Sequence, residues 1–446
     1  MRAEDYLGEL APRGIRLGLD VTRQLMEAFP EALKVPAVLI AGTNGKGSTS
    51  AILESILRAA GYKTGLYTSP HLENVEEQIR LHGEPLTSDE LSDALDEVRG
   101  AAERAGVADE VTVFEVMTVA ALRTFARAGV DLAVVEAGLG GARDATNVLN
   151  PLVSVVTTVS RDHEALLGTT LGKIARDKAG VFRAERPAIW GWAHTQAETM
   201  LENCAYDVGA LPIAARMETR SISREEVDGR QEIHVETRLE KYNVNLPLAG
   251  GHQAYNLALA ILVTESLTKR GFENLDVEAV EKGASTCVWP GRLETLRGES
   301  GRPVILDAAH NSLGAKTLAI WLSEQKEPYD LLFGSLRSKD AFTMLSRLGP
   351  QARQIILTAP LDPRALDPME FLEEVREDPR GIGPRRLWDQ LPPIEVEDLE
   401  KAIRRAHHEE TVPLVVAGSL RLVGDVRQRL QPSQEPAGGD AGEPSE

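Results

Sequence analysis

Residues 37–49 read AVLIA-GTNGKGST, a short apolar run followed by a glycine-rich loop that contains a lysine. Directly after it, apolar residues recur at helical spacing between Ser48 and Ala60, and Gly61 stands where such a helix would end. A buried strand, a glycine loop and a helix in this order are typical of the first unit of a parallel sheet covered by helices. The stretch therefore predicts an α/β fold.

The loop offers the groups that hold phosphate oxygens. Glycines let backbone N–H groups curl around an anion, a helix N-terminus adds positive potential, and Lys46 supplies a point charge. The strict pattern G-x-x-x-x-G-K-[ST] is not met, because the first glycine stands three residues before Gly45 and Gly47 intervenes before Ser48. An ordinary glycine turn is the alternative, and the order of strand, loop, lysine and helix disfavours it. We therefore expect nucleotide phosphates at Gly42, Thr43, Asn44, Gly45, Lys46, Gly47, Ser48 and Thr49.

Composition narrows the class of protein. The 446 residues include 49 Lys and Arg against 68 Asp and Glu, a net charge of −19, and no basic block is present. Nucleic acid is therefore not expected as a partner. No apolar run approaches the roughly 18 residues of a membrane span, and the first residues do not read as a signal peptide. We expect a soluble, cytoplasmic protein, in which Cys204 and Cys287 build neither a disulfide framework nor a zinc site.

The alternation of β-branched apolar runs with helical segments occurs twice, which predicts two α/β domains. Between them, residues 233–248 alternate apolar and polar positions with period two, as antiparallel strands do. An isolated Pro-Gly within Val288–Gly291 favours a hinge there. We expect one domain over 1–289, a second over 290–430, and a disordered tail over 431–446, where acids, Pro, Gly and Ser prevail.

Polar residues follow the predicted strands of the first domain. Ser69 stands beyond the run 64–67, Glu136 beyond 132–135 and His163 beyond 152–158. Ligands gather at the carboxyl ends of parallel strands, so these three side chains are expected on the rim that carries the loop. Mg²⁺ favours oxygen ligands, which suits Ser69 and Glu136, whereas a histidine nitrogen is a less usual ligand. The alternatives are a capping or ion-paired carboxylate for Glu136 and a structural hydrogen-bonded role for His163.

Lys178 falls on the apolar stripe of a predicted helix with Leu171, Ile174 and Ala175. One interpretation is a lysine that covers apolar surface with its stem and reaches water with its ammonium group. The other is a buried lysine with a lowered pKa that can be modified. The pattern alone favours the first.

In the second domain, Asp307 and His310 follow the apolar run 304–306. Arg292 stands just past the hinge, where a guanidinium could reach a phosphate group. An isolated charged residue at such a position is structural about as often as functional.

These residues occur in motifs that resemble those of folylpolyglutamate synthase and the bifunctional dihydrofolate synthase, within the Mur-type amide ligases. The motifs run in family order from the glycine loop to the last helix. They comprise residues 42–49, 67–72, 114–116, 135–141, 144–148, 162–163 with 167–168, 177–180, 252–253 with 256, 290–292, 307–311 and 418–420.

The resemblance implies an ATP- and Mg²⁺-dependent ligase that joins L-glutamate to dihydropteroate or a reduced folate through an acyl phosphate. Its fold would be a phosphate-loop parallel sheet of the Mur central-domain type with an antiparallel extension, followed by a Rossmann-like α/β domain. It would be a monomer. The implied metal ligands are Ser69, Glu136, His163 and Lys178. Lys178 would act as a carbamylated lysine, and this expectation replaces that of a lysine which covers apolar surface and reaches water. Asn256 and Arg292 would contact nucleotide, and Lys46, Lys178, His163, Asp307 and His310 would serve catalysis, with Asp307 also at the nucleotide.

Two departures from the family pattern bear on substrate preference. Glu76-Glu77-Gln78-Ile79 stands where the family usually shows Asn-Glu-Arg-Ile, and the arginine of the run 140–144 is shifted by one position. A Mur-type ligase for a different acid therefore stays open as an alternative. A nucleotide-binding switch without an acyl acceptor is the rival from another class.

Overall fold

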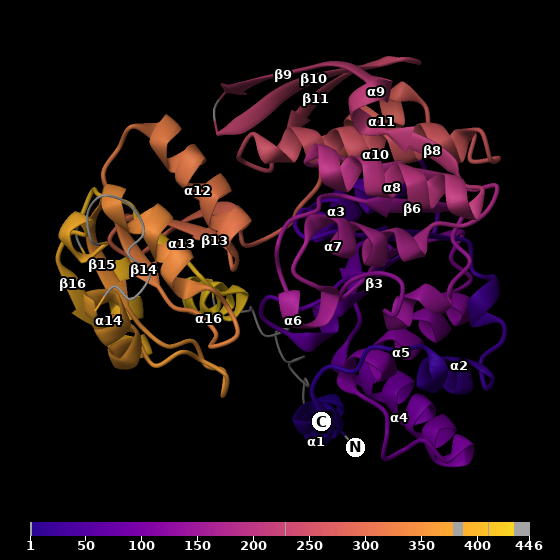
Figure 1. The fold of residues 1–446 in the computed structure, drawn as a ribbon, viewed down its shortest axis with the longest axis horizontal. Helices are drawn as coiled ribbons and strands as arrows, with labels where there is room; N and C mark the ends of the chain where they lie inside the picture. Colours follow the sequence, from indigo (N-terminus) through magenta and orange to yellow (C-terminus); the bar gives the residue numbers. More distant parts are fainter. Residues whose placement is uncertain (1, 228, 378–386, 409, 432–446) are drawn as a thin grey trace, which may run out of the picture. The chain divides into compact units, whose positions relative to one another are not determined.

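The computed structural model describes residues 2–227, 229–377, 387–408 and 410–431. The chain divides into two compact units, Met1–Pro290 and Gly291–Glu446 (Figure 1). The boundary falls within the segment where the sequence predicts a hinge. Most of the predicted tail, residues 432–446, lies outside the described residues. In the described part of the chain, no helix is long and apolar enough to cross a membrane.

The main sheet of the first unit has eight strands among the described residues, in the order β4-β3-β2-β5-β1-β6-β7-β8. Strands β2, β5, β1, β6, β7 and β8 run parallel, whereas β3 and β4 pair antiparallel at one edge. The bounds are β1 Ala37–Ala41, β2 Thr64–Tyr67, β3 Ile79–Leu81, β4 Glu84–Pro85, β5 Leu132–Glu136, β6 Val153–Val156, β7 Pro187–Trp190 and β8 Leu211–Ala214.

Helices cover both faces of this sheet. Their bounds are α1 Ala3–Leu10, α2 Asp20–Met26, α3 Lys46–Ala59, α4 Ser88–Ala105, α5 Val113–Ala128, α6 Glu164–Leu167, α7 Leu171–Lys178, α8 Thr195–Val208, α9 Ala215–Glu218, α10 His252–Thr268 and α11 Val277–Ser285. Alternate residues of β1 belong to different cores: Leu39 lies in the core with α1, α2, α4 and α5, and Ile40 in the core with α3 and α10. A strand buried on both faces explains why residues 37–41 are apolar throughout.

A separate three-stranded antiparallel sheet, β11-β10-β9, packs against α10 and α11 (Figure 1). Its strands are β9 Thr219–Val227, β10 Arg230–Thr237 and β11 Lys241–Leu246. The inward-facing residues of β10 and β11, such as Ile233 and Val244, join the core that contains α3 and α10. This sheet is the predicted antiparallel extension, and α10 lies between it and the rest of the first unit.

The second unit holds a six-stranded sheet within the described residues, ordered β12-β13-β17-β14-β15-β16. Only β12, at the edge, runs antiparallel to its neighbour. The strands are β12 Arg292–Arg297, β13 Pro303–Asp307, β14 Tyr329–Phe333, β15 Ala352–Leu357, β16 Ile394–Val396 and β17 Leu414–Ala417. The helices are α12 Ser312–Gln325, α13 Ala341–Leu348, α14 Pro368–Glu377, α15 Leu399–Arg404 and α16 Leu420–Leu430. The predicted pair of α/β domains is confirmed.

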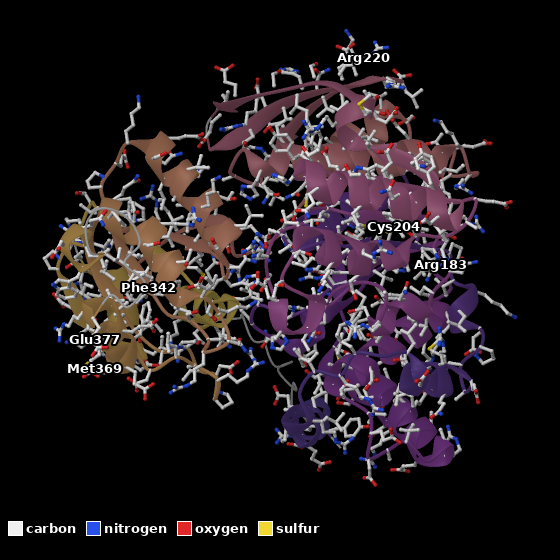
Figure 2. All side chains as sticks on the ribbon, viewed as in Figure 1. Arg183, Cys204, Arg220, Phe342, Met369 and Glu377 are labelled. Carbon is white, nitrogen blue, oxygen red and sulfur yellow. The ribbon has the colours of Figure 1, made fainter. Side chains whose placement is uncertain are left out.

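Short 3₁₀ turns link several elements. They are Ala11–Arg13, Ala32–Lys34, Val75–Gln78, Ala145–Val148, Ala179–Val181, Gly349–Gln351, Trp388–Gln390 and Arg405–His407. Both cysteines are free thiols, and Cys204 lies half-buried on α8 (Figure 2).

Candidate active site

The glycine loop after β1 is held in place by the end of β6. Thr43 and Asn44 donate backbone N–H bonds to the Thr158 carbonyl and hydroxyl oxygens, each at 2.9 Å. The Thr157 hydroxyl donates in turn to the Asn44 carbonyl at 2.7 Å. A neighbouring strand thus fixes the loop, and the loop leads into the first turn of α3, where helix N–H groups attract anions.

Gly45 caps the N-terminus of α3 and has φ +84°, in the region that favours glycine. A Cβ atom at this position would lie 2.5 Å from Asn256 Oδ1. Asn256 is buried in α10 and donates its amide to Gln253 Oε1 at 2.9 Å. The structure therefore brings Asn256, which the resemblance places at the nucleotide, against the loop.

Lys46 and Glu136 meet beside the loop. Glu136 is the last residue of β5, the strand next to β1, and it is buried. Lys46 Nζ lies 3.5 Å from Glu136 Oε1. The carboxylate that is predicted to bind metal thus forms an ion pair, which was its alternative interpretation. Lys46 is thus placed to meet the phosphate groups of a nucleotide, and Glu136 is placed to meet the cation that they bind.

Lys178 is buried, with 3% of its surface exposed, and Nζ donates to the Gly42 carbonyl at 2.8 Å. The interpretation of a lysine that reaches water is therefore wrong. Burial, and next the charge of Lys46, lower the pKa of Lys178 to about 7, while Asp177, Asp162 and other carboxylates oppose that shift. A neutral amine is consequently well populated at neutral pH, which a modifiable lysine requires.

Ser69 follows β2, the strand that pairs with β5, at the edge of the sheet where Glu136 ends β5. Tyr67 of β2 pairs with Val135 of β5, so Thr68 stands opposite Glu136 and Ser69 follows. Ser69 is half-buried in the loop after β2 and precedes a cis peptide bond to proline. The two oxygen donors therefore stand at the carboxyl ends of neighbouring strands, Ser69 in the loop after β2 and Glu136 at the end of β5.

His163 occupies a different segment, at the start of α6, where it has φ +51°. Its Nε2 lies 3.7 Å from Asp162 Oδ1. The Asp162 charge acts on Lys178, since it raises the pKa of that lysine against the effect of burial. His163 therefore stands next to a residue that lies close to Lys178.

The donor set fits one mode of metal binding. Within the residues that the structure describes, no group of three or more His, Cys, Asp or Glu side chains could hold a metal ion. Mg²⁺ at nucleotide sites usually takes one or two protein oxygens, phosphate oxygens and water. The Ser69 hydroxyl and the Glu136 carboxylate suit that mode. Ligation by His163 and by a modified Lys178 stays a prediction.

Asp144 is an organising residue to which sequence reasoning assigned no role. It is buried, and it accepts hydrogen bonds from the Leu139 N–H at 2.8 Å and from the Thr146 N–H at 3.0 Å. It thereby shapes the glycine turn after β5 that follows Glu136. Burial raises the pKa of Asp144. The pattern Asp-x-Thr, which forms an Asx turn, is the signal that could have identified it.

The departure at Glu76–Gln78 has a structural account. Glu77 accepts backbone N–H bonds from Leu72, Glu73 and Asn74 at 2.9–3.1 Å. Gln78, which stands where the family shows arginine, contacts His71 Nδ1 at 2.9 Å. The loop after Ser69 is thus braced by a glutamate, and Gln78 meets a histidine in place of presenting a cation.

In the second unit, Asp307 ends β13 and pairs in register with Arg292 of β12. The buried carboxylate accepts N–H bonds from Leu293 and Ala309. Burial raises the pKa of Asp307 to about 6, and Arg292 opposes the shift. His310 Nδ1 lies 2.9 Å from the Ala308 carbonyl. The structure therefore gathers the three predicted residues of this unit at one strand end.

Two family models cover the chain. The model "Mur ligase middle domain" matches residues 40–264, and "Mur ligase, glutamate ligase domain" matches residues 291–420. The first match contains the glycine loop, Glu136, Lys178 and Asn256, and the second contains Asp307 and His310.

Similar proteins share the name folylpolyglutamate synthase, alone or together with a second activity. The Dihydrofolate synthase/folylpolyglutamate synthase of Bacillus subtilis is 32% identical over 94% of this chain and 96% of its own length. A probable bifunctional folylpolyglutamate synthase/dihydropteroate synthase of Haloferax volcanii is 33% identical over 95% of this chain, which spans only 50% of that protein. The crystal structure of Mycobacterium tuberculosis folylpolyglutamate synthase complexed with ADP and AMPPCP matches with a TM-score of 0.85 at 30% identity, over 96% of this chain and 98% of that one.

One family model matches half of the chain, and relatives match nearly all of it. The glycine loop, the buried lysine and the second α/β unit point to the same family. The chain belongs to the Mur ligase family, among the folylpolyglutamate and dihydrofolate synthases.

Proposed function

We propose that the chain is an ATP- and Mg²⁺-dependent ligase that joins L-glutamate to dihydropteroate, to a reduced folate, or to both. The observation that carries the proposal is the meeting of Lys46 and Glu136, 3.5 Å apart, at a glycine loop that opens α3. This arrangement gathers a cation, a carboxylate and helix N–H groups at one point, as phosphoryl transfer from a nucleotide requires.

The reaction needs an activated acid, because a carboxylate is a poor electrophile. The γ-phosphoryl group of ATP moves to the pterin-linked carboxylate, and Lys46 and the N–H groups of α3 stabilise the charge on its oxygens. Bound Mg²⁺ supplies further charge neutralisation, and Ser69 and Glu136 are the residues that would hold it. The amine of glutamate then attacks the acyl phosphate, and the amide forms as phosphate leaves.

Lys178 takes part through its neutral form. A free amine can add CO₂ and release a proton to give a carbamate, whose negative charge would accompany that of Glu136 at the rim. The carbamate would replace the ammonium that now bonds the Gly42 carbonyl. We propose this modified lysine and His163 as further metal ligands.

Residues of the second unit serve the nucleotide and the transfer step. Arg292 offers a guanidinium that binds phosphate oxygens in bidentate geometry. Asp307 and His310, which stand at one strand end, contact the nucleotide and the reacting groups. Asn256 acts from the first unit, beside Gly45.

We propose a monomer as the active form, as the family resemblance implies. We propose the cytoplasm as its place of action because ATP and reduced folates are drawn from the metabolite pool there. Light scattering of the purified protein should give the mass of one 48.5 kDa chain, and a dimer mass would contradict the first point.

A paired assay tests the function. Purified protein receives ATP, Mg²⁺ and glutamate with either dihydropteroate or tetrahydrofolate, and ADP release is measured under identical conditions. We expect ADP with at least one pterin and none without glutamate. Turnover with neither pterin contradicts the folate assignment and favours a Mur-type ligase for another acid. ADP release that needs no acceptor would favour a nucleotide-binding switch.

A further inference from the structure

An aromatic pair stands at the carboxyl edge of the main sheet, in a place that the roles above leave unused. Trp192 follows the end of β7, and Tyr255 lies in the first turn of α10. Their ring centroids are 4.8 Å apart at an interplanar angle of 65°, an edge-to-face contact. Trp192 packs against the core that contains α10, whereas 48% of Tyr255 is exposed.

Each residue of the pair is next in sequence to a residue that contacts the glycine loop or the segment that supports it. Tyr255 directly precedes Asn256, whose amide abuts Gly45. Gly191, which directly precedes Trp192, comes so close to β6 that a Cβ atom there would lie 2.2 Å from the Thr157 carbonyl oxygen. The hydroxyl of this same threonine bonds the loop at Asn44. Because β7 is the second neighbour of β1, the two strand ends lie about 10 Å apart.

This distance suits the shape of a nucleotide. A nucleoside triphosphate whose phosphates sit on the loop carries its base one sugar away, along the same edge. An aromatic ring that is rigidly buttressed and half exposed offers a flat apolar surface, on which a base stacks favourably. The Trp192 ring holds Tyr255 in its orientation and so reduces the cost of ordering it on binding.

We propose that Tyr255, buttressed by Trp192, is the surface on which the purine base of the nucleotide stacks, and that it sets a preference for purine over pyrimidine nucleotides. The larger bicyclic ring covers more of the tyrosine face than a pyrimidine does. The inference rests on the proposed function in one respect, namely that the loop binds nucleotide phosphates.

The test separates base from phosphate recognition. Calorimetric titration measures the affinity of the full chain, with Mg²⁺, for ADP, for UDP and for inorganic tripolyphosphate, which has no base. Tyr255→Ala should weaken ADP binding about tenfold, reduce the ADP-to-UDP ratio, and leave tripolyphosphate binding unchanged. Tyr255→Phe, which keeps the ring, should bind ADP as the unmodified protein does. Trp192→Leu should fall between the two.

Tyr206→Ala is the matched control. Tyr206 is 62% exposed near the end of α8, which leads away from the carboxyl edge toward the start of β8, so its loss should change no affinity. Lys46→Ala should lose ADP and tripolyphosphate together. If Tyr255→Ala binds ADP normally, or loses both ligands equally, the stacking role is wrong. If the unmodified protein binds neither ligand, the phosphate role of the loop is wrong as well.

Discussion

Lys178 lies on the apolar stripe of its helix, but its side chain ends at a polar partner. Its ammonium group points at the Gly42 carbonyl, and burial lowers its pKa to about 7. A lysine at this depth is costly in charged form, so the fold favours a state in which the charge is removed or converted. The same burial makes it a group whose chemistry can be tested directly.

Replacing Lys178 by alanine should abolish turnover, because the proposed carbamate is lost. Short-chain carboxylic acids should restore part of the rate in Lys178→Ala, since they return a carboxylate to the cavity left by the side chain. Lys178→Arg, which fills the space but cannot form a carbamate, should be inactive and should not respond. Full activity of Lys178→Ala without any acid would show that no carbamate is needed.

Asp307 should make the stability of the folded chain depend on pH. Burial raises its pKa to about 6 in the folded chain, from the value of 3.8 that is usual for an exposed aspartate and that we take for the unfolded chain. The folded state therefore binds more protons between these values, and stability falls as the pH rises from about 4 to 6. The cost of ionisation is about 3 kcal/mol at neutral pH. Asp307→Asn removes it.

Chemical denaturation of both proteins at pH 4 and at pH 7.5 checks this. We expect Asp307→Asn to gain stability relative to the unmodified chain at the higher pH only. An equal difference at the two pH values would mean that the carboxyl titrates normally in the folded chain. Activity should be lost in either case, since the carboxylate is proposed to serve the transfer step.

At this scale, the sequence predicts residues that stand at strand ends and misses those that act through hydrogen bonds. Glu136 and Asp307 each follow an apolar run, so the sequence indicates that each stands at the carboxyl end of a strand. It does not indicate the depth of Lys178, because an apolar stripe is compatible with a side chain that reaches water. Asp144 was missed since its role depends on two backbone N–H groups of a turn whose shape no periodicity encodes.

Among the elements, the N-terminus of α3 depends on Gly45. Alanine there would meet Asn256 Oδ1 at 2.5 Å and would hold an unfavourable φ of +84°. Gly106, the C-cap of α4, has a similar φ of +72° with nothing within 4 Å of an added Cβ atom. Both substitutions carry the backbone cost of about 1–2 kcal/mol, but only the first disturbs the loop.

Gly45→Ala should therefore weaken ADP binding strongly, while Gly106→Ala should destabilise the chain and bind ADP as before. Thermal denaturation gives the stability of each variant, and titration gives its affinity. Equal affinities for the two variants would show that the contact between the loop and α10 has no part in nucleotide binding.

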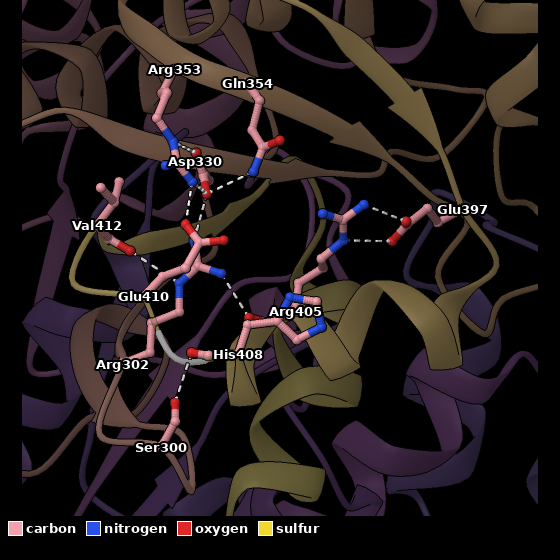
Figure 3. Close-up of polar contacts among 10 residues, drawn as sticks. All are labelled: Ser300, Arg302, Asp330, Arg353, Gln354, Glu397, Arg405, His408, Glu410 and Val412. Carbon is pink, nitrogen blue, oxygen red and sulfur yellow. Dashed lines mark hydrogen bonds and ion pairs between the residues drawn. The ribbon is translucent and has the colours of Figure 1, made fainter.

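The sheet of the second unit contains a buried charge cluster at the start of its central strands (Figure 3). Asp330 of β14 is fully buried and accepts hydrogen bonds from Arg302 at 2.5 Å, Arg353 at 2.6 and 2.8 Å, and Gln354 at 2.8 Å. Burial acts to raise the pKa of Asp330, but these bonds prevail and hold it below its usual value. The cluster ties β14 to β15 and to the residue that precedes β13.

Asp330→Asn should destabilise the chain by about 3–5 kcal/mol, because it removes the carboxylate nearest to the buried Arg302 guanidinium and leaves only Glu410, at 3.9 Å, as its counter-charge. Arg337→Ala is the matched control: it breaks the exposed pair of Arg337 and Glu370 and should cost less than about 1 kcal/mol. Urea denaturation measures both. Comparable losses in the two variants would mean that the Asp330 cluster contributes no more than a surface ion pair.

Element by element, the apolar runs identified in the sequence coincide with strands to within a few residues, as at β1 and β2, but the buried strand β7 was not predicted. Strand β9 was not predicted, since it is largely exposed and its sequence, TRSISREEV, lacks a clear alternation. The edge strands β3 and β4 are too short for a periodic signal. Both kinds of strand form because they pair with a neighbouring strand, and a local sequence pattern does not indicate such pairing.

Over the whole molecule, two α/β units divide the proposed chemistry. The first unit gathers the loop, Lys46, Glu136 and Lys178, and the second gathers Arg292, Asp307 and His310. The sequence predicted this division from the repeated alternation of strands and helices and from the Pro-Gly at residues 290–291. The motifs that link both units to one reaction came from the resemblance, because strand ends alone do not define a substrate.

The central claim is that ATP energises a carboxylic acid by phosphorylating it. Dihydropteroate or the accepted folate, labelled with ¹⁸O in the carboxylate that receives glutamate, tests this most directly when mass spectrometry follows both products. An acyl phosphate intermediate transfers one carboxylate oxygen to phosphate, so we predict one ¹⁸O atom in each phosphate released and one retained in the new amide. Amide formation with unlabelled phosphate would contradict the account.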